Sequence, residues 1–397
     1  MPSKYVEGVY PIFIERGKGC HVWDNQDTPY IDYPNALGAI LLGYSYPAVN
    51  EAIKDQLNYG TIFTFPSILE GVLAEKLTQI IPCAEMVQFL KTGSDATSAA
   101  VKVARAYTGK DHVAFCGYHG WHDWFTVNTP KNKGIPSEYV KYTHKFVFND
   151  IKSLEKIFEE VNAGVGAVIL EPCIWEEPKD GFLSKVKKLC QKHGAVLIFD
   201  EVVTGFRFPG FSAQKFFKVT PDLSAFGKAM ANGMPISFVC GKKEIMEVLK
   251  GDCFISTTFG GELLSIVAAL ATIKVLETEP VFDKFWYLGN YLKDGYNEIA
   301  KELGLDTKCI GYPNRTMHTF PTAEHKGLFW QECVKRQVIF GYAQFINYSH
   351  NQADIDYTLD VVREALKVLK KNWKDPKKAL EGNPPAEVFR LLVEKDK

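Results

Sequence analysis

The stretch Val165–Leu170 constrains the fold more than any other part of the sequence, because it has no polar position. A wholly apolar run of this length fits a strand that helices cover on both faces. Similar apolar runs alternate with amphipathic stretches between residues 86 and 241. We expect the strands Met86–Leu90, Val113–Cys116, Lys145–Phe148, Val165–Glu171, Ala195–Asp200 and Ile236–Gly241, and the helices Ser94–Tyr107, Ile151–Val161 and Ser184–His193. This alternation predicts an α/β fold with an open, mostly parallel sheet.

The two ends of the chain predict a second, smaller domain. A chain of 397 residues exceeds one ordinary core and suggests about two domains. The flanks contain a hairpin pattern, Cys20–Trp23 with Tyr30–Tyr33, and the helical patterns Ser265–Glu277, Asp283–Leu303 and Ile355–Leu369. We therefore expect a large domain over residues 51–265, a small α+β domain built from 1–50 and 266–369, and a solvated tail over 370–397.

Composition and charge argue against several classes of function. The formal net charge is -1, which leaves no electrostatic footprint for nucleic acid or an anionic membrane. Nine cysteines, an odd number with no C-x-x-C pair, argue against a disulfide framework and against a thiolate zinc site. No signal peptide and no apolar run of membrane-spanning length is apparent. We therefore expect a cytoplasmic protein.

A carboxylate at a strand end and a lysine in a later loop carry the main chemical signal. An apolar run ends at Asp200, and Lys228 follows in Phe226-Gly227-Lys228. Ligands of open α/β sheets bind outside the carboxyl ends of the strands, where Asp200 is expected. Pyridoxal phosphate (PLP) needs both groups, because a lysine holds it as a Schiff base and a carboxylate keeps its pyridine nitrogen protonated. Taken singly, Asp200 also fits a helix cap, Glu201 a surface charge and Lys228 an exposed loop lysine.

A phosphate site is predicted where Gly93 and Ser94 open a helix directly after the strand Met86–Leu90. The free N–H groups and the positive dipole end of such a helix bind anions, and a plain N-cap at Ser94 is the alternative. No G-x-G-x-x-G occurs, and the segment around Lys228 lacks the first glycine and the Ser/Thr of a P-loop. Dinucleotide and P-loop nucleotide sites are therefore disfavoured.

The aromatic segment Gly117–Trp124 follows another predicted strand. Tyr118 offers a ring that can stack on a flat cofactor, and an aromatic loop at the edge of the core is the alternative. His119 and His122 have the spacing of metal ligands, but no acidic or thiolate partner is near them in the sequence, so we expect no metal.

Taken together, these motifs make the chain similar to the class III aminotransferases, fold type I of the PLP enzymes, and to the glutamate-1-semialdehyde aminomutase branch in particular. The resemblance extends from about Gly19 to Leu369. It rests on Trp23-Asp24, Tyr30–Tyr33, Gly93–Thr97, Tyr118-His119-Gly120, Leu170-Glu171-Pro172, Asp200–Arg207, Phe226-Gly227-Lys228, Thr258–Gly261 and Asp354-Ile355-Asp356. Several ordered motifs over most of a chain seldom coincide by accident.

The resemblance implies a role for each matching residue. It implies that Lys228 forms the Schiff base with PLP, that Asp200 pairs with the pyridine nitrogen, and that His119 and Glu171 belong to the surrounding shell. It implies further that Val202 packs on one face of the ring and Tyr118 on the other, that Gly93 and Ser94 donate N–H groups to the phosphate, and that Thr258 reaches the phosphate of a neighbouring subunit. A homodimer with shared active sites is therefore expected.

The chain differs from the aminomutases at positions that recognise the substrate in that family. The family's N-terminal arginine is absent from Val6–Pro11, with Arg16 and Arg207 as possible substitutes, and a pocket tryptophan falls at about Ala36. The family's Gln-Phe-Glu motif corresponds to Gln344-Phe345-Ile346 in this chain, so the apolar Ile346 replaces an acidic residue. These departures favour an aminotransferase that uses an amino donor and an aldehyde or ketone acceptor, such as a keto-sugar or nucleotide-sugar. A glutamate-1-semialdehyde aminomutase is the alternative, and a PLP-binding regulator without catalysis a third possibility.

Overall fold

The computed structural model describes residues 6–385 of the chain. They form two units, which are described separately. The terminal unit takes in the described residues up to Asn50 and from Lys274 onwards, and the central unit runs from Glu51 to Ile273. The central unit thus ends later than the boundary at residue 265 that the sequence suggested. Within residues 6–385, no helix is long and apolar enough to cross a bilayer.

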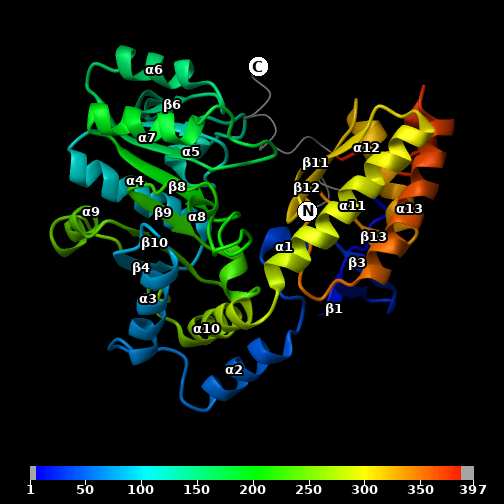
Figure 1. Cartoon of the computed structure of the whole chain (residues 1–397), viewed down its shortest axis with the longest axis horizontal. Coiled ribbons are helices and arrows are strands. Elements are labelled where there is room, and N and C mark those ends of the chain that lie inside the picture. The colour runs from blue at the N-terminus through cyan, green and yellow to red at the C-terminus, as the bar shows by residue number, and fades with distance from the viewer. Residues whose placement is uncertain (1–5, 386–397) are drawn as a thin grey trace. The chain divides into compact units, whose positions relative to one another are not determined.

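The central unit is built on a seven-stranded sheet with the order β4-β10-β9-β8-β7-β5-β6 (Figure 1). Its strands are β4 (Met86–Leu90), β5 (His112–Cys116), β6 (Thr143–Lys145), β7 (Val165–Leu170), β8 (Val196–Glu201), β9 (Leu223–Phe226) and β10 (Ser237–Gly241). Strands β5 to β9 are parallel to one another, whereas β10 is antiparallel to both β9 and β4. The predicted mostly parallel sheet is confirmed.

Helices cover both faces of this sheet. Alternate residues of β5, Val113 and Phe115, pack with α4 (Gly93–Thr108) and with Ile245 and Met246 of α9 (Lys243–Met246). The intervening residues, Ala114 and Cys116, pack on the other face with α6 (Ile151–Glu160) and α7 (Phe182–His193). All six residues of β7 are buried, as expected for a strand covered on both sides.

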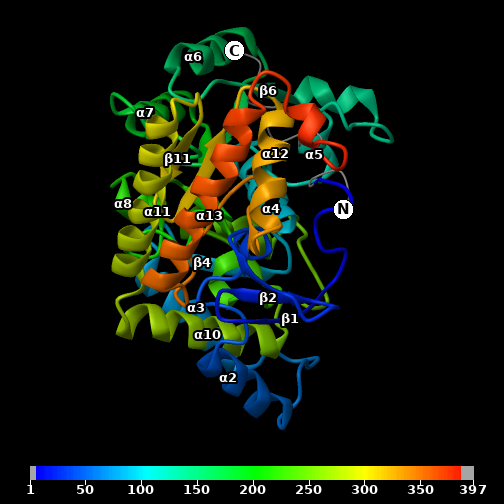
Figure 2. The same cartoon turned by 90° about the vertical axis from the view of Figure 1, so that its right-hand side faces the viewer.

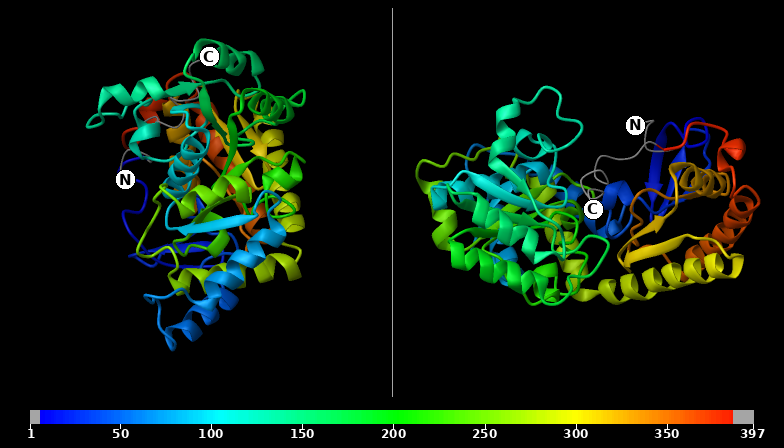
Figure 3. Two further views of the ribbon diagram at one scale, coloured as in Figure 1. Left: turned by 90° about the vertical axis from the view of Figure 1, so that its left-hand side faces the viewer. Right: turned by 90° about the horizontal axis from the view of Figure 1, so that it is seen from above.

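The terminal unit combines strands from both ends of the chain in the sheet β1-β2-β3-β13. Its strands are β1 (Ile14–Lys18), β2 (His21–Asp24), β3 (Pro29–Asp32) and β13 (Val338–Ile339), with a separate hairpin of β11 (Lys308–Tyr312) and β12 (Arg315–Thr319). Only β13 is parallel to its partner, β3. Helices α11 (Val281–Leu303), α13 (Gln352–Lys371) and α12 (Ala323–Val334) lie side by side in that order (Figure 2), and α11 is the long yellow helix in the right-hand view of Figure 3.

The remaining elements are short or connect these parts. They are the α-helices α1 (Asn35–Gly38), α2 (Pro47–Leu57), α3 (Ile68–Ile80), α5 (Asp123–Thr126), α8 (Ala213–Phe216) and α10 (Leu263–Thr278), and the 3₁₀ helices η2 (Ser137–Tyr142), η3 (Lys228–Ala231), η4 (Glu247–Lys250) and η5 (Pro376–Ala379).

Two strand predictions were wrong or incomplete. The strand expected at Lys145–Phe148 pairs at Thr143–Lys145 instead, because these residues lie opposite Val113–Phe115 of β5. The apolar residues of the expected stretch instead pack against helices. Strand β9 was not predicted, since Leu223–Phe226 is short and carries a serine that the fold buries.

The segment 370–385 is anchored at particular points, although most of its side chains are exposed or half-buried, as a solvated tail requires. Pro376 is buried, and Gln331 of α12 fixes the backbone on both sides of Leu380. Its Nε2 donates to the Ala379 carbonyl at 2.9 Å, and its Oε1 accepts from the Glu381 N–H at 2.8 Å. Backbone hydrogen bonds to a buried glutamine anchor this segment without an apolar pattern. The rest of the predicted tail, 386–397, lies outside the described residues.

Candidate PLP site

The predicted site residues follow the ends of four neighbouring strands of the central sheet. Cys116 lies opposite Leu170, Leu170 opposite Phe199, and Glu201 opposite Phe226. Because the four strands are parallel, the residues that come next in the chain emerge at the same edge: Gly117–His119 after β5, Glu171 after β7, Asp200 at the end of β8, and Lys228 after β9. Ligands of α/β sheets bind at this edge.

Lys228 begins η3 directly after the extended residue Gly227. Its side chain is half-buried, and its φ of +44° lies in the left-handed region that L-residues seldom adopt. A non-glycine residue in this region costs of order 1–3 kcal/mol and is held there by its surroundings. The backbone therefore fixes the starting direction of this lysine side chain.

Asp200 is paired with a buried histidine. Asp200 is 4% exposed and His119 1% exposed, and the Asp200 Oδ2 and His119 Nδ1 atoms are 2.8 Å apart. His119 Nε2 lies 3.1 Å from the Cys116 carbonyl oxygen, which only accepts, so Nε2 carries a hydrogen. The contact to Asp200 then needs a second hydrogen between Nδ1 and Oδ2. The other carboxylate oxygen, Oδ1, accepts from the Val202 N–H at 3.0 Å.

The N-terminus of α4 has the features of a phosphate site. Thr92 is the N-cap and forms a capping box with Asp95, so the Ser94 cap considered from the sequence was assigned to the wrong residue. Gly93 and Ser94 occupy the first two helical positions, whose N–H groups have no acceptor within a helix. A Cβ on Gly93 would stand 2.6 Å from Val202 Cγ1, so the glycine lets Val202 approach the start of the helix.

Val202 also connects the helix start to the lysine loop. Its Cγ1 would be 3.7 Å from a Cβ on Gly227, the residue before Lys228. The predicted ring-packing residue therefore lies between the predicted phosphate-binding turn and the predicted Schiff-base lysine.

The aromatic loop after β5 is fastened to the same helix. Thr97 Oγ1 donates to the His119 carbonyl at 2.7 Å, and Ser94 Oγ accepts from the Trp121 N–H at 3.2 Å. The Tyr118 N–H donates to Glu171 Oε1 at 3.3 Å. These bonds hold the segment that carries Tyr118 and His119 against α4 and β7. Thr97 belongs to the motif Gly93–Thr97, but nothing in the sequence indicated that it anchors the aromatic loop.

His122 does not join His119 in a metal site. Its Nδ1 is 2.7 Å from Ser98 Oγ and its Nε2 is 3.6 Å from Asp95 Oδ1, whereas His119 is held by Asp200 and Cys116. The two histidines thus have different partners.

Glu201 is fully buried, so the surface-charge interpretation of this residue was wrong. It accepts hydrogen bonds from Thr204 Oγ1, the Ala213 N–H, and both the N–H and Nε2 of Gln214. Burial raises the pKa of Glu201 to about 7, and these four donors act in the opposite direction. Adjacent strand residues point to opposite faces of the sheet, so the side chains of Asp200 and Glu201 lie in different surroundings. Gln214 carried no sequence signal.

Thr258 is the one predicted site residue that the described chain does not bring to this cluster. It is exposed in the segment between η4 and α10, and within residues 6–385 no hydrogen bond joins it to the other predicted residues. Its role at a neighbouring subunit stays a prediction.

The residues present fit PLP. A lysine follows one strand, a buried carboxylate backed by a histidine ends the adjacent strand, and a glycine at a helix N-terminus lets Val202 approach the first turn. Together they make a candidate site for the cofactor of a fold type I PLP enzyme.

Comparison with known proteins shows the family of the chain. Residues 3–307 match the family model described as aminotransferase class-III, and the chain belongs to this family. It is 37% identical to a 3-aminobutyryl-CoA aminotransferase of Cloacimonas acidaminovorans (strain Evry), over 93% of this chain and 92% of that protein. It is 33% identical to a glutamate-1-semialdehyde 2,1-aminomutase of Syntrophobacter fumaroxidans (strain DSM 10017 / MPOB), over 90% of each. The chain is therefore a PLP-dependent aminotransferase or a related aminomutase.

Solved structures support the same fold. The PLP form of the FumI protein from Sphingopyxis sp. MTA144 has a TM-score of 0.89 at 27% identity, covering 95% of this chain and 94% of that one. An omega-transaminase from Sphaerobacter thermophilus has a TM-score of 0.85 at 26% identity, covering 92% and 93%. The predicted fold class and the predicted cofactor are confirmed.

Proposed function

We propose that this enzyme is an aminotransferase that moves an amino group from a small-molecule donor to an aldehyde or ketone acceptor. The observation that carries the proposal is the placement of Lys228 and the Asp200–His119 pair at the ends of adjacent parallel strands. When bound, PLP supplies an electron sink for the bond that is broken at the amine-bearing carbon.

Asp200 serves to hold the pyridine nitrogen in its protonated form. Its Oδ1 and Oδ2 already accept from the Val202 N–H and the hydrogen shared with His119, and each carboxylate oxygen has a second lone pair for a cofactor N–H. His119 and Val202 therefore hold both oxygens of this buried carboxylate in place for the cofactor.

Lys228 serves as the general base and acid. Its Nζ removes the proton from the amine-bearing carbon and delivers a proton at the next step, a role that typically contributes 10²- to 10⁴-fold in rate. The left-handed backbone at Lys228 and the extended Gly227 set the direction of this side chain. Gly93 and Ser94 hold the phosphate through their N–H groups, while Val202 and Tyr118 orient the ring.

The active unit is proposed to be a homodimer in which Thr258 completes the phosphate site of the partner. Two exposed aromatic residues, Phe254 and Phe259, flank Thr258, and Phe65 and Ile68 are exposed on a neighbouring segment. The two segments are in contact, because the Leu263 N–H donates to the Thr61 carbonyl at 2.8 Å. Several large apolar side chains exposed on two adjoining segments are typical of an interface.

The acceptor is proposed to lack the carboxylate of glutamate-1-semialdehyde. A buried carboxylate needs a charged partner, best an arginine, and Val6–Pro11 contains none. Of the possible substitutes, Arg16 pairs with Asp27 at 2.5 Å and Arg207 is fully buried in the central unit. A keto-sugar is one acceptor class that fits. A 3-oxoacyl thioester is another, in view of the relative named 3-aminobutyryl-CoA aminotransferase.

Half-reactions test this proposal. Enzyme loaded with the pyridoxamine form of the cofactor is mixed with a keto-sugar, a 3-oxoacyl thioester or glutamate-1-semialdehyde, and the cofactor spectrum is followed in single turnover. We expect conversion with one of the first two and little with the third. Conversion of glutamate-1-semialdehyde to 5-aminolevulinate without an amino donor would favour the aminomutase alternative, which the relatives named glutamate-1-semialdehyde 2,1-aminomutase support.

Complementation tests the dimer. Light scattering is expected to give twice the chain mass. Inactive Lys228→Ala chains mixed with Thr258→Ala chains should recover activity, because each mixed dimer contains one site with both residues intact. A fully active monomer would contradict the shared site.

A further inference from the structure

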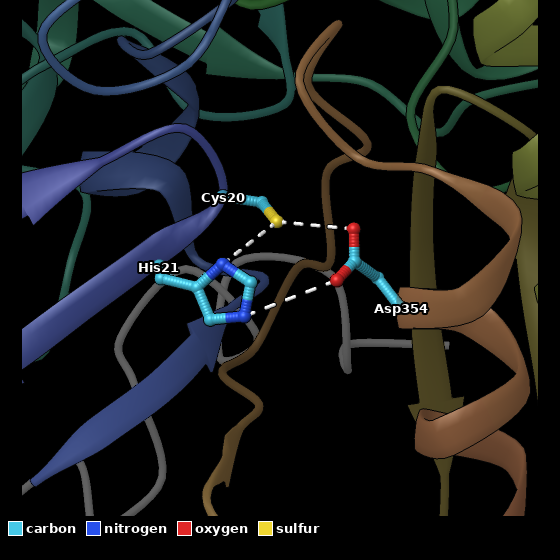
Figure 4. Close-up of side chains that lie close together, drawn as sticks. All are labelled: Cys20, His21 and Asp354. Atoms are coloured by element: carbon cyan, nitrogen blue, oxygen red, sulfur yellow. Dashed lines mark hydrogen bonds and ion pairs between the residues drawn. The ribbon is translucent and has the colours of Figure 1, made fainter.

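Three side chains with metal-ligating atoms converge in the terminal unit, away in sequence from every predicted PLP residue (Figure 4). Cys20 precedes β2, His21 begins β2, and Asp354 lies in the first turn of α13. Cys20 Sγ is 3.3 Å from His21 Nδ1 and 3.4 Å from Asp354 Oδ2. One ligand atom from each residue can be chosen so that all three lie within 4.8 Å of one another.

The two separations from Cys20 Sγ fit the edges of a coordination tetrahedron. Zn–S and Zn–N distances of ~2.3 and ~2.0 Å place neighbouring ligand atoms about 3.5 Å apart in tetrahedral geometry. The two sulfur contacts, at 3.3 and 3.4 Å, are close to that edge length. Thiolate, imidazole and carboxylate are also the three ligand types that zinc takes in proteins.

The cluster is buried on one side and open on the other. Cys20 is 2% exposed, whereas the side chains of His21 and Asp354 are 36% and 11% exposed. A cavity of about 220 Å³ is lined by His21, Asp354, Tyr357, Gln337, Ile31 and Pro29, among others. An ion bound by the three side chains would therefore have room for a water or another ligand at its fourth position.

Charge balance also suits a divalent cation. The Cys20 thiol donates a hydrogen bond to Asp354 Oδ2 at 3.4 Å and therefore carries a hydrogen. On binding, the S–H bond breaks, the proton leaves to solvent, and sulfur forms a bond to the metal. One thiolate and one carboxylate then balance the two positive charges.

We propose that Cys20, His21 and Asp354 bind one divalent transition-metal ion, Zn²⁺ by ligand preference, with the fourth position open to the adjacent cavity. Such an ion joins the N-terminal hairpin to the start of α13. The two segments are more than 300 residues apart in the chain, so binding constrains the terminal unit and stabilises its folded form.

Zinc binding to the holoenzyme tests the proposal. The protein is treated with a chelator, dialysed, and titrated with Zn²⁺ alone by calorimetry, and bound metal is counted after gel filtration. We expect one equivalent of zinc in the wild type and a rise in unfolding temperature that the chelator reverses. Cys20→Ala and His21→Ala should each lose that equivalent or bind it at least about tenfold more weakly, since one of three ligands is removed.

The control is Cys333→Ala, which removes another buried thiol of the terminal unit and should keep the equivalent of bound zinc.

Asp354 is better changed to Asn than to Ala, because it also caps α13 by accepting from the Asn351 N–H at 2.9 Å. Zinc held by the cofactor or by other thiols is common to all variants and cancels in the comparison. The PLP absorbance and circular dichroism of each variant show whether it has folded.

Cobalt gives a second readout that does not depend on stability. Co²⁺ bound through a thiolate is expected to absorb at wavelengths beyond those of PLP, and this absorption should vanish in Cys20→Ala. The proposal is overturned if the folded wild type binds no more zinc, and no more tightly, than Cys20→Ala. The three side chains would then be a hydrogen-bonded network only.

Discussion

The central and terminal units assemble their reactive side chains in different ways. In the central unit, Asp200 and Lys228 follow adjacent parallel strands, and their closeness follows from the direction of those strands. In the terminal unit, Cys20 and Asp354 come from opposite ends of the chain and meet only because β2 and α13 belong to one unit. The first arrangement is inherent in an α/β sheet, whereas the second depends on individual packing contacts.

Both units also bury a carboxylate at a strand end. Asp32 ends β3, where it accepts from Tyr44 Oη at 2.6 Å and from the Asn35 N–H at 3.2 Å. Asp200 is equally buried but is backed by a histidine at the predicted ligand edge. Burial alone therefore does not distinguish a structural carboxylate from a reactive one, whereas a position at the ligand edge of the sheet and a histidine partner do.

Replacing Lys228 should produce the largest loss of activity. Lys228→Ala removes the proposed base, so turnover should fall by at least about 10³-fold, and the absorption band that the lysine gives with the cofactor should disappear. The measurements are steady-state turnover and the visible spectrum. Lys308→Ala, at an exposed lysine of the terminal unit, should leave both unchanged. Wild-type turnover in Lys228→Ala would show that the lysine is misassigned.

Asp200→Asn and Asp32→Asn should have different effects, the first on catalysis and the second on stability. The amide cannot stabilise a protonated pyridine nitrogen, so the rate of proton abstraction should fall by more than about tenfold, ~1.4 kcal/mol in the barrier, with cofactor still bound. Asp32→Asn is expected to lower the unfolding temperature instead. A fall of less than tenfold for Asp200→Asn in single-turnover kinetics would remove Asp200 as the pyridine partner.

Gly93→Ala should weaken cofactor binding more than it weakens folding. The added Cβ would meet Val202 Cγ1 at 2.6 Å, so either Val202 or the start of α4 must shift, at a typical cost of about 1–3 kcal/mol. We expect the dissociation constant of PLP to rise by about tenfold or more. The matched control is Gly71→Ala in α3, where an added Cβ would meet no atom within 4 Å. Equal PLP affinity in both variants would contradict the proposed phosphate site.

The smallest expected effect is on the pH dependence of stability. The folded pKa of Glu201 is about 7, above its ordinary value of 4.5, so the folded state binds more protons than the unfolded state between these values. Stability from this group is therefore present at low pH and is lost as pH rises from about 4.5 through 7. Relative to Glu201→Gln, the wild type should lose about 1 to 3 kcal/mol of unfolding free energy over this range.

Denaturant titrations of both proteins at several pH values measure this difference. Burial raises the pKa of Asp32 to about 6 as well, and this contribution is common to both proteins and cancels. A constant difference between wild type and variant from about pH 4.5 to 7.5 would mean that the four donors around Glu201 outweigh its burial.

The sheet and its ligand edge could be predicted because they depend on local patterns. Wholly apolar runs such as Val165–Leu170 mark buried parallel strands, and a polar residue directly after such a run must emerge at the carboxyl edge. Asp200 was placed by this rule, Tyr118 by its aromatic ring in a segment that follows a predicted strand, and His119 and Glu171 by the family resemblance. The first turn of α4 was placed by its glycine, although its cap is Thr92 rather than Ser94.

Only the tertiary structure decided which side chains are partners. The His119–Asp200 contact joins residues 81 positions apart, and the Cys20–Asp354 contact joins residues 334 positions apart. The absence of C-x-x-C pairs argued against a thiolate metal site, yet a thiol, an imidazole and a carboxylate converge without that spacing. The sequence alone determined the strand pattern and the residue types at the strand ends, because these follow from local periodicity. Contacts between distant segments depend on how whole elements pack, and no local pattern encodes that.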